Sequence, residues 1–146
     1  MSLRKFVLVT IDPYFIGPTM SGHDLQKWIA EISATIDNKD DVKFASYFQP
    51  DGVFRYGNQP EVTGTDGVAS YVKAFFGSIE SLQHELVALH ESKHSDTITW
   101  QGRCTYVRLD KHVVTIDFCN VLTMEGPLIK TYMVYIDTTP LFSPID

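Results

Sequence analysis

Four residues in the C-terminal half of the chain can do acid–base chemistry if the fold brings them together. His84 begins a strand-like stretch, and histidine is the side chain that gains and loses a proton near neutral pH. Asn120, Tyr106 and Tyr132 are neutral groups that can donate a hydrogen bond to a substrate oxygen. One imidazole with three neutral donors and no carboxylate can move a proton and stabilise an enolate oxygen. The set predicts a substrate with a carbonyl or phenol in an apolar frame.

Asn120 interrupts an otherwise apolar strand face. Side chains alternate along a strand, so the residues that share its face are Val114, Ile116, Phe118 and Leu122. An unpaired buried amide costs about 1–3 kcal/mol, so this one needs a partner or a polar pocket. An Asn that satisfies backbone groups of the strand is the alternative, and a hydrogen-bonded structural histidine is the alternative for His84. The sequence leaves both open.

Two periodicities predict the elements that position these residues. Before Leu82, apolar residues recur at three- and four-residue spacing, which predicts helices over about 22–36, 41–48 and 65–79, with a short strand at 53–56. Asp40 and Thr65 are expected to cap the second and third helices. After Leu82 the pattern alternates and predicts four strands with short turns between them. These strands are Leu82–Glu91, Thr97–Leu109, Val113–Met124 and Leu128–Asp137. Long strands joined by short turns form an antiparallel meander, so the sequence predicts an α+β fold with helices on one face of the sheet.

Length and charge exclude several classes of protein. A chain of 146 residues is the usual size of one domain. We divide it into an N-terminal arm, residues 1–23, and a domain, residues 24–146. The net charge is −6, and no run of Lys or Arg exceeds two residues, which disfavours nucleic acid and anionic membrane surfaces as partners. No segment approaches the length of a membrane span, and the expected location is the cytoplasm.

Cofactor and metal motifs are missing from the sequence. It contains no GxGxxG and no P-loop, so no nucleotide or redox cofactor is expected. The two cysteines, Cys104 and Cys119, form no CxxC motif and lie in apolar strand-like stretches. We interpret them as buried reduced thiols, with no metal site.

Several segments, in order, resemble a known family. They are Ile36-Asp37-Asn38-Lys39-Asp40, Phe44-Ala45-Ser46-Tyr47-Phe48, Asp51-Gly52-Val53-Phe54-Arg55-Tyr56, Val62-Thr63-Gly64, His84, Gly102–Tyr106 and Tyr132–Asp137. Together they look like SnoaL-like domains of the nuclear transport factor 2 superfamily, which includes ketosteroid isomerases, scytalone dehydratases, limonene epoxide hydrolases and polyketide cyclase relatives. The resemblance implies a cone-shaped, curved antiparallel sheet wrapped around three N-terminal helices, with a pocket at its open end. It also implies a homodimer and cofactor-free acid–base chemistry on polyketide-, steroid- or terpenoid-like compounds.

The resemblance also assigns residues to the pocket. It places Tyr132 on the interior face and implies a cavity that holds His84, Tyr106, Asn120 and Tyr132. The expected substrate-binding residues are Trp28, Ile32, Tyr56, Phe75, Arg108, Phe118 and Ile136. Asn120 falls where ketosteroid isomerases carry a protonated Asp, Tyr56 or Arg55 falls at their Asp base, and Ile32 replaces their helix Tyr. Because the main acid and base are missing, the chain departs from a ketosteroid isomerase.

Three functions remain open at this point. The first is a cofactor-free isomerase, cyclase or dehydratase, the second a binding protein for a small apolar ligand, and the third a protein-association domain. Strand parity places Val87, Leu89 and Val107 on the face opposite the pocket, where they would be exposed apolar residues. We therefore expect a homodimer through the outer face of the sheet.

Overall fold

The structure is a computed structural model, and it describes residues 22–144. The predicted arm lies outside the described residues as far as residue 21, and Gly22 begins the first helix. The helices are α1 (Gly22–Asp37), α2 (Asp41–Ser46), α3 (Thr65–Gly77) and α4 (Thr139–Phe142). The strands are β2 (Phe48–Tyr56), β3 (Val62–Thr63), β4 (Ile79–Glu91), β5 (Thr97–Arg108), β6 (Val113–Glu125) and β7 (Leu128–Ile136).

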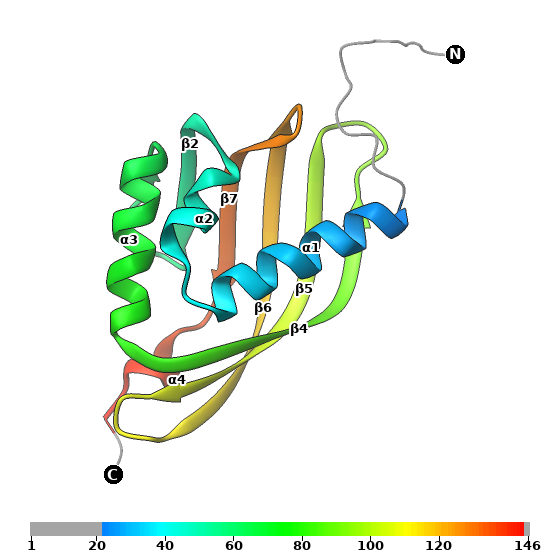
Figure 1. Ribbon diagram of the computed structural model, residues 1–146. Helices are drawn as coiled ribbons and strands as arrows, with labels where there is room; N and C mark the ends of the chain where they lie inside the picture. The colour runs from blue at the N-terminus through cyan, green and yellow to red at the C-terminus, as the bar shows by residue number, and fades with distance from the viewer. Residues whose placement is uncertain (1–21, 145–146) are drawn as a thin grey trace.

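One strongly curved sheet of six strands organises the fold, in the order β3-β2-β7-β6-β5-β4 (Figure 1). Strands β4 to β7 pair antiparallel in chain order, so the predicted meander is confirmed. Strand β2 adds a parallel pair with β7, and β3 returns antiparallel to β2. The α+β class and the cone-shaped sheet are therefore confirmed, with one parallel pair at the β2 side.

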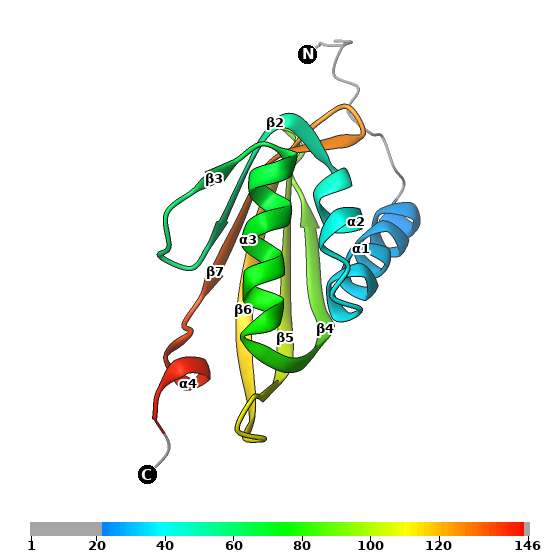
Figure 2. The same cartoon turned by 60° about the vertical axis from the view of Figure 1, so that its left-hand side comes forward.

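The three N-terminal helices lie on the concave side of this sheet (Figures 1 and 2). The residues that α1 buries, Leu25, Ile29 and Ile32, recur at the three- and four-residue spacing of one helix face. Helix α3 buries Val68, Val72 and Phe76 at four-residue spacing. Because the sheet bends around these faces, the core lies between helices and sheet and encloses the candidate site.

Strand parity predicts the buried faces of β5, β6 and β7 correctly, but it fails in β4. A register shift between Leu86 and Ala88 inserts an extra residue, so the side chains beyond it change faces. Leu89 is half-buried and packs against the core, whereas parity had placed it on the outer face. Val87 lies at the bulge and remains 57% exposed.

Strand β2 begins earlier than the sequence predicts. Phe48 was expected to end the second helix, but it is the first residue of β2 and is buried against Phe44. Pro50-Asp51-Gly52 does not end an element and instead forms an irregularity inside the strand, between Phe48 and Val53. Glycine fits there because a Cβ at Gly52 would lie 3.0 Å from the Phe48 ring.

One of the two predicted helix caps is present. The Asp40 carboxylate accepts a hydrogen bond from the Lys43 amide at 2.9 Å, so the predicted cap of α2 is confirmed. Thr65 is the first residue of α3 and not its cap. Gly64 occupies the cap position with φ of 86°, a conformation that glycine adopts without a steric penalty.

Gly102 allows an aromatic side chain to cross the sheet surface. A Cβ at this position would lie 2.4 Å from the Phe118 ring and 2.7 Å from the Glu85 carbonyl oxygen. Phe118 therefore lies over the backbone of β5, against Trp100 at 5.1 Å and His84 at 5.3 Å between ring centroids. The absence of a side chain at Gly102 therefore sets the position of Phe118, which lines the candidate site.

Gly102→Ala is expected to destabilise the fold by about 1–3 kcal/mol, because an overpacked core must shift its side chains. Gly77→Ala is the matched control, since no atom lies within 4 Å of a Cβ there. Urea unfolding would measure both variants. Equal stabilities for the two would contradict the assigned packing of Phe118.

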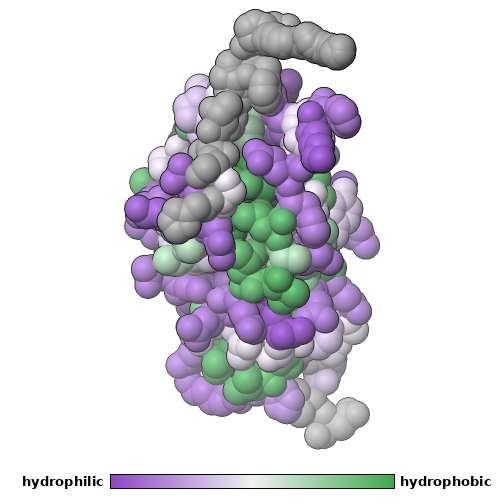
Figure 3. Space-filling model, turned by 90° about the vertical axis from the view of Figure 1, so that its right-hand side faces the viewer, coloured by the Kyte–Doolittle hydropathy of each residue, from purple (hydrophilic) through white to green (hydrophobic). Residues whose placement is uncertain are grey.

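Apolar side chains gather on the side of the molecule where α1 lies beside β4 (Figure 3). A hollow there is lined by Leu25, Leu86, Val87, Ala88 and Leu89, among others. The outer sheet residues Val113 and Tyr135 are also more than half exposed. Between residues 22 and 144, no helix is both long enough and apolar enough to cross a bilayer.

The homodimer stays a prediction, now based on Val87, Val113 and Tyr135 and no longer on Leu89. We expect light scattering to give twice the chain mass at tens of micromolar, where interfaces of ordinary size hold. Tyr135→Ser should shift the balance toward monomer. A wild-type chain that is monomeric at this concentration would contradict the expectation.

Candidate functional site

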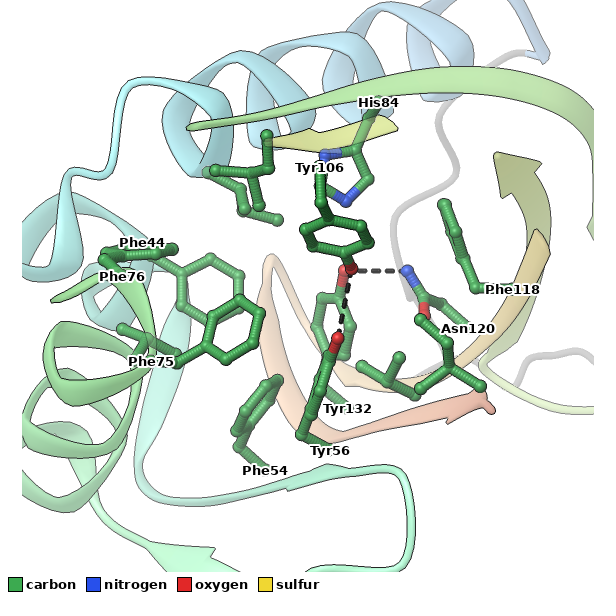
Figure 4. A pocket seen from close by; sticks show the side chains of 15 residues that line it. Phe44, Phe54, Tyr56, Phe75, Phe76, His84, Tyr106, Phe118, Asn120 and Tyr132 are labelled. Carbon is green, nitrogen blue, oxygen red and sulfur yellow. Dashed lines mark hydrogen bonds between the residues drawn. The ribbon is translucent and has the colours of Figure 1, made fainter. Parts of the chain in front are cut away.

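An apolar cavity opens inside the curved sheet, under α2 and α3 (Figure 4). The cavity has a volume of about 50 Å³. The empty space around it, including the open mouth, is about 470 Å³. Its lining is Ile36, Phe44, Phe54, Tyr56, Val72, Phe75, Phe76, Leu82, His84, Tyr106, Phe118, Asn120, Tyr132, Val134 and Ile136. His84, Tyr106, Asn120 and Tyr132 thus line one cavity, together with four of the seven expected binding residues: Tyr56, Phe75, Phe118 and Ile136.

His84 is held in the cavity wall by Asp37. The Asp37 carboxylate lies 2.6 Å from Nδ1 of the His84 ring and also accepts a hydrogen bond from the His84 backbone amide at 3.1 Å. Because a carboxylate only accepts hydrogen bonds, Nδ1 must carry the proton of this contact. The second ring nitrogen points toward the middle of the cavity (Figure 4). Asp37 therefore fixes both the orientation of the imidazole and the nitrogen that faces a ligand.

The environment raises the pKa of His84 to about 9. Burial is the largest single influence and lowers the pKa, because it disfavours the charged ring. The hydrogen bond to Asp37, with smaller contributions from Cys104, raises it by more than burial lowers it. A histidine with this pKa is a stronger base than usual, and it rests mainly as an imidazolium at neutral pH.

Asp37 was not predicted as a site residue from the sequence, because its neighbours indicate a polar turn. It is the last residue of α1, where the helix dipole disfavours a negative charge. No basic residue lies in the last turn of α1 to offset it. An acid in that position is a signal that a cation from elsewhere in the chain pairs with it, and here that cation is the His84 imidazolium.

Four oxygen- and nitrogen-bearing groups form two pairs in the cavity wall. The hydroxyl oxygens of Tyr56 and Tyr106 lie 3.0 Å apart. Nδ2 of Asn120 donates to the Tyr132 hydroxyl at 3.0 Å, while Oδ1 of the same buried amide has no hydrogen-bond partner among the described residues. Because Asn120 donates to Tyr132, the hydrogen of that hydroxyl is free to be donated to a ligand.

These tyrosines are neutral at physiological pH. Burial raises the pKa of Tyr56, Tyr106 and Tyr132 above the usual value, because an anion would be poorly solvated there. In the Tyr56–Tyr106 pair one hydroxyl hydrogen is used internally and the other remains available, and the hydroxyl hydrogen of Tyr132 is also available. The wall opposite an acid–base group therefore offers neutral donors to an oxygen that gains charge.

Three expected binding residues do not line the cavity. Ile32 is fully buried in the core, and Trp28 packs edge-on against Tyr47 at 6.1 Å. Ile32 was assigned by analogy with a helix residue of the family, and Trp28 shares its apolar helix face, but the cavity begins further along α1, at Ile36. Arg108 instead donates to the carbonyl oxygens of Pro140 and Ser143, at 3.1 and 2.7 Å. It holds α4 and does not bind in the cavity.

The remaining wall is aromatic and aliphatic, and it was expected only as core. Phe44, Phe54 and Phe76 come from α2, β2 and α3, and ring centroids of Phe44 and Phe54 lie 5.6 Å from the Tyr132 ring. Their periodicity fits core packing and cavity lining equally well, so spacing alone could not separate the two roles.

Both cysteines are free thiols, as expected, but Cys119 is only half-buried and not buried as predicted. Cys104 is fully buried, with its sulfur 3.9 Å from Nδ1 of His84. In the described part of the chain, no three His, Cys, Asp or Glu side chains gather as a metal site would require. The exposed residue Asp117 pairs with Arg103 at 3.1 Å on the outer face, opposite Asn120.

The SnoaL-like domain model matches residues 26–132, nearly three-quarters of the sequence. The chain belongs to the SnoaL-like family. No curated protein matches it. The match covers every cavity residue except Val134 and Ile136, so the family assignment and the cavity concern the same part of the chain.

Solved structures share the SnoaL-like fold at low sequence identity. A nuclear transport factor 2-like protein of unknown function from Burkholderia pseudomallei K96243 has a TM-score of 0.74 and 16% identity, and covers 86% of this chain and all of its own. TerC, co-crystallised with polyporic acid, has a TM-score of 0.68 and 17% identity, and the match covers 79% of this chain and 92% of TerC. An LEH-like epoxide hydrolase from M. tuberculosis has a TM-score of 0.64 and 12% identity, and the match covers 80% of this chain and 84% of that protein. These relatives establish the fold.

The His84–Asp37 pair predicts a specific pH dependence of stability. A folded pKa of about 9, above the unfolded value of about 6.5, stabilises the fold below pH 6.5. This contribution is lost as the pH rises through 9. The difference in unfolding free energy between wild type and His84→Gln should therefore shrink from pH 6 to pH 10, as urea unfolding would measure. A difference that stays constant would contradict the raised pKa.

Proposed function

We propose that this SnoaL-like protein is a cofactor-independent enzyme that moves a proton next to a carbonyl group, as an isomerase, cyclase or dehydratase does. One observation carries the proposal. Nδ1 of a buried histidine is fixed by a carboxylate at 2.6 Å, and its other nitrogen points into an apolar cavity that contains neutral hydrogen-bond donors. The substrate class is a small polyketide-, steroid- or terpenoid-like carbonyl compound.

In the proposed reaction His84 acts as a proton shuttle. Its neutral form takes a proton from the carbon next to the carbonyl, and the electron pair moves to the carbonyl oxygen as an enolate. Asp37 stabilises the imidazolium that forms. The imidazolium then returns the proton, either to a different carbon, which isomerises the substrate, or to a departing hydroxyl, which leaves as water.

The tyrosine hydroxyls are the proposed ligands of the enolate oxygen. Tyr132, oriented by Asn120, and the Tyr56–Tyr106 pair each have one hydrogen free to donate. In a dry apolar site such donors are worth more than in water, because no solvent competes for the oxygen. Asn120 then acts through Tyr132 as a positioning residue.

The fold relatives are consistent with this class of function. TerC was crystallised with an organic acid, polyporic acid, and the M. tuberculosis relative is described as an epoxide hydrolase. At 12–17% identity these ligands and reactions do not transfer residue by residue. They support a small-molecule pocket and leave the reaction to be tested.

A binding protein without turnover is the second candidate. The raised pKa of His84 favours it, because only a small fraction of the ring is neutral at pH 7. In that case the imidazolium would hold a carbonyl or an anionic oxygen without removing a proton. Turnover and its dependence on pH separate the two functions.

Exchange of the carbon-bound protons of 2-tetralone in D₂O, followed by NMR, tests proton removal without knowledge of the natural substrate. We expect catalysed exchange, with kcat/KM rising with pH and levelling near pH 9 as His84 loses its proton. His84→Gln should remove catalysed exchange. Tyr132→Phe should lower kcat by about a hundredfold, the loss typical of one oxyanion donor.

His90→Gln is the matched control, because His90 is an exposed histidine on the same strand. Asp37→Asn should move the pH profile to lower pH and reduce its plateau, because the imidazolium loses its carboxylate. Binding of 2-tetralone with no exchange above the rate of the His84→Gln variant would favour the binding protein and reject the enzyme.

A further inference from the structure

A second hollow lies beside the cavity, between α3 and the C-terminal helix α4. Its lining is Tyr56, Gln59, Tyr71, Ala74, Phe75, Ser78, Thr138 and Phe142. Its volume is about 360 Å³, and it is open to solvent. We refer to it as the α3–α4 groove.

The α3–α4 groove adjoins the cavity at two shared residues. Tyr56 and Phe75 line both spaces, and their rings pack against each other with centroids 4.8 Å apart. The Phe75 ring also meets Tyr106 inside the cavity, at 6.3 Å. The aromatic pair is thus the wall between the two spaces, and a ligand that occupies both has to displace one of these two rings.

The inner cavity is too small for a large ligand, but the groove has room. The cavity has a volume of about 50 Å³, whereas the groove, which is open to solvent, has about 360 Å³. The paired hydrogen-bonding groups and His84 belong to the inner wall, whereas Gln59, Ser78 and Thr138 are the polar residues of the groove. The groove presents mainly the aromatic rings of Tyr71, Phe75 and Phe142, with Phe142 54% exposed.

The outer wall of the groove is held in place by the chain itself. Arg108 donates two hydrogen bonds to the carbonyl oxygens of Pro140 and Ser143, which flank Leu141 and Phe142. Leu141 is buried, and this anchors α4 while the next residue, Phe142, remains at the surface. Arg108, expected to bind substrate directly, thus positions a wall that a ligand could contact.

We infer that the α3–α4 groove is a subsite for the apolar tail of the ligand whose carbonyl head occupies the cavity. The inference rests on the proposed function for the head group. The occupant is an elongated molecule: a small ring carrying the carbonyl inside, and an alkyl or aryl extension that lies between Ala74 of α3 and Phe142 of α4. Phe142 is a specificity residue for that extension and takes no part in the proton transfer.

Two probes test the subsite: 2-tetralone, and 6-butyl-2-tetralone, which adds an apolar tail. We expect wild type to bind the butyl compound at least tenfold more tightly, as burial of several methylene groups allows. Phe142→Ser should remove most of that advantage and leave the affinity for 2-tetralone unchanged. Ala74→Glu, on exposed helix surface, should do the same by placing a charge in the groove. Val42→Ser is the control, because Val42 is 71% exposed and lies outside both hollows.

The outcomes separate this inference from the proposed function. If the butyl advantage is missing, or if both groove variants keep it, the subsite is wrong even when 2-tetralone exchange is catalysed. If both ketones bind with the expected preference but no exchange is catalysed, the subsite holds and the enzyme proposal fails. If neither ketone binds to wild type, both are contradicted.

Discussion

The contact between Asp37 and His84 joins the helical layer to the sheet at the point where the cavity is built. It places a carboxylate at the C-terminal end of α1, where the helix dipole disfavours it, and a partly charged imidazole in a mostly apolar wall. The pair joins the end of α1 to β4, in addition to the buried apolar face of the helix. The protonation of His84 therefore depends on Asp37.

The sheet around this contact combines a curved shape with closely fitted aromatic rings. Gly102 leaves room for Phe118 over β5, and Phe118 in turn packs against the His84 ring. The bulge after Leu86 changes the direction of β4 just beyond His84. The polar groups that remain are paired with one another, Tyr56 with Tyr106 and Asn120 with Tyr132, which lowers the cost of keeping them in an apolar wall.

Periodicity in the sequence was sufficient to predict the meander and the faces of β5, β6 and β7, because burial on one face imposes strict alternation. Together with the family resemblance, which assigns the interior face, it placed His84, Tyr106, Asn120 and Tyr132 on the inner side, and all four line the cavity. It failed where one residue breaks the alternation, so Leu89 was placed on the wrong face. Asp37 could not be found from spacing, since its partner is 47 residues away. Ile32 was assigned by family analogy, which carries the fold but not the lining of each pocket, and Trp28 was assigned from the helix face that it shares with Ile32.

The protonation of His84 in the folded protein tests this account most directly. Nitrogen-15 NMR of labelled histidine reports the protonation state and the pKa of each ring as pH is varied. The account predicts a pKa near 9 for His84 in wild type, and a clearly lower value in Asp37→Asn, where burial acts without the carboxylate. A wild-type pKa near 6.5 that Asp37→Asn leaves unchanged would contradict the pairing on which the site depends.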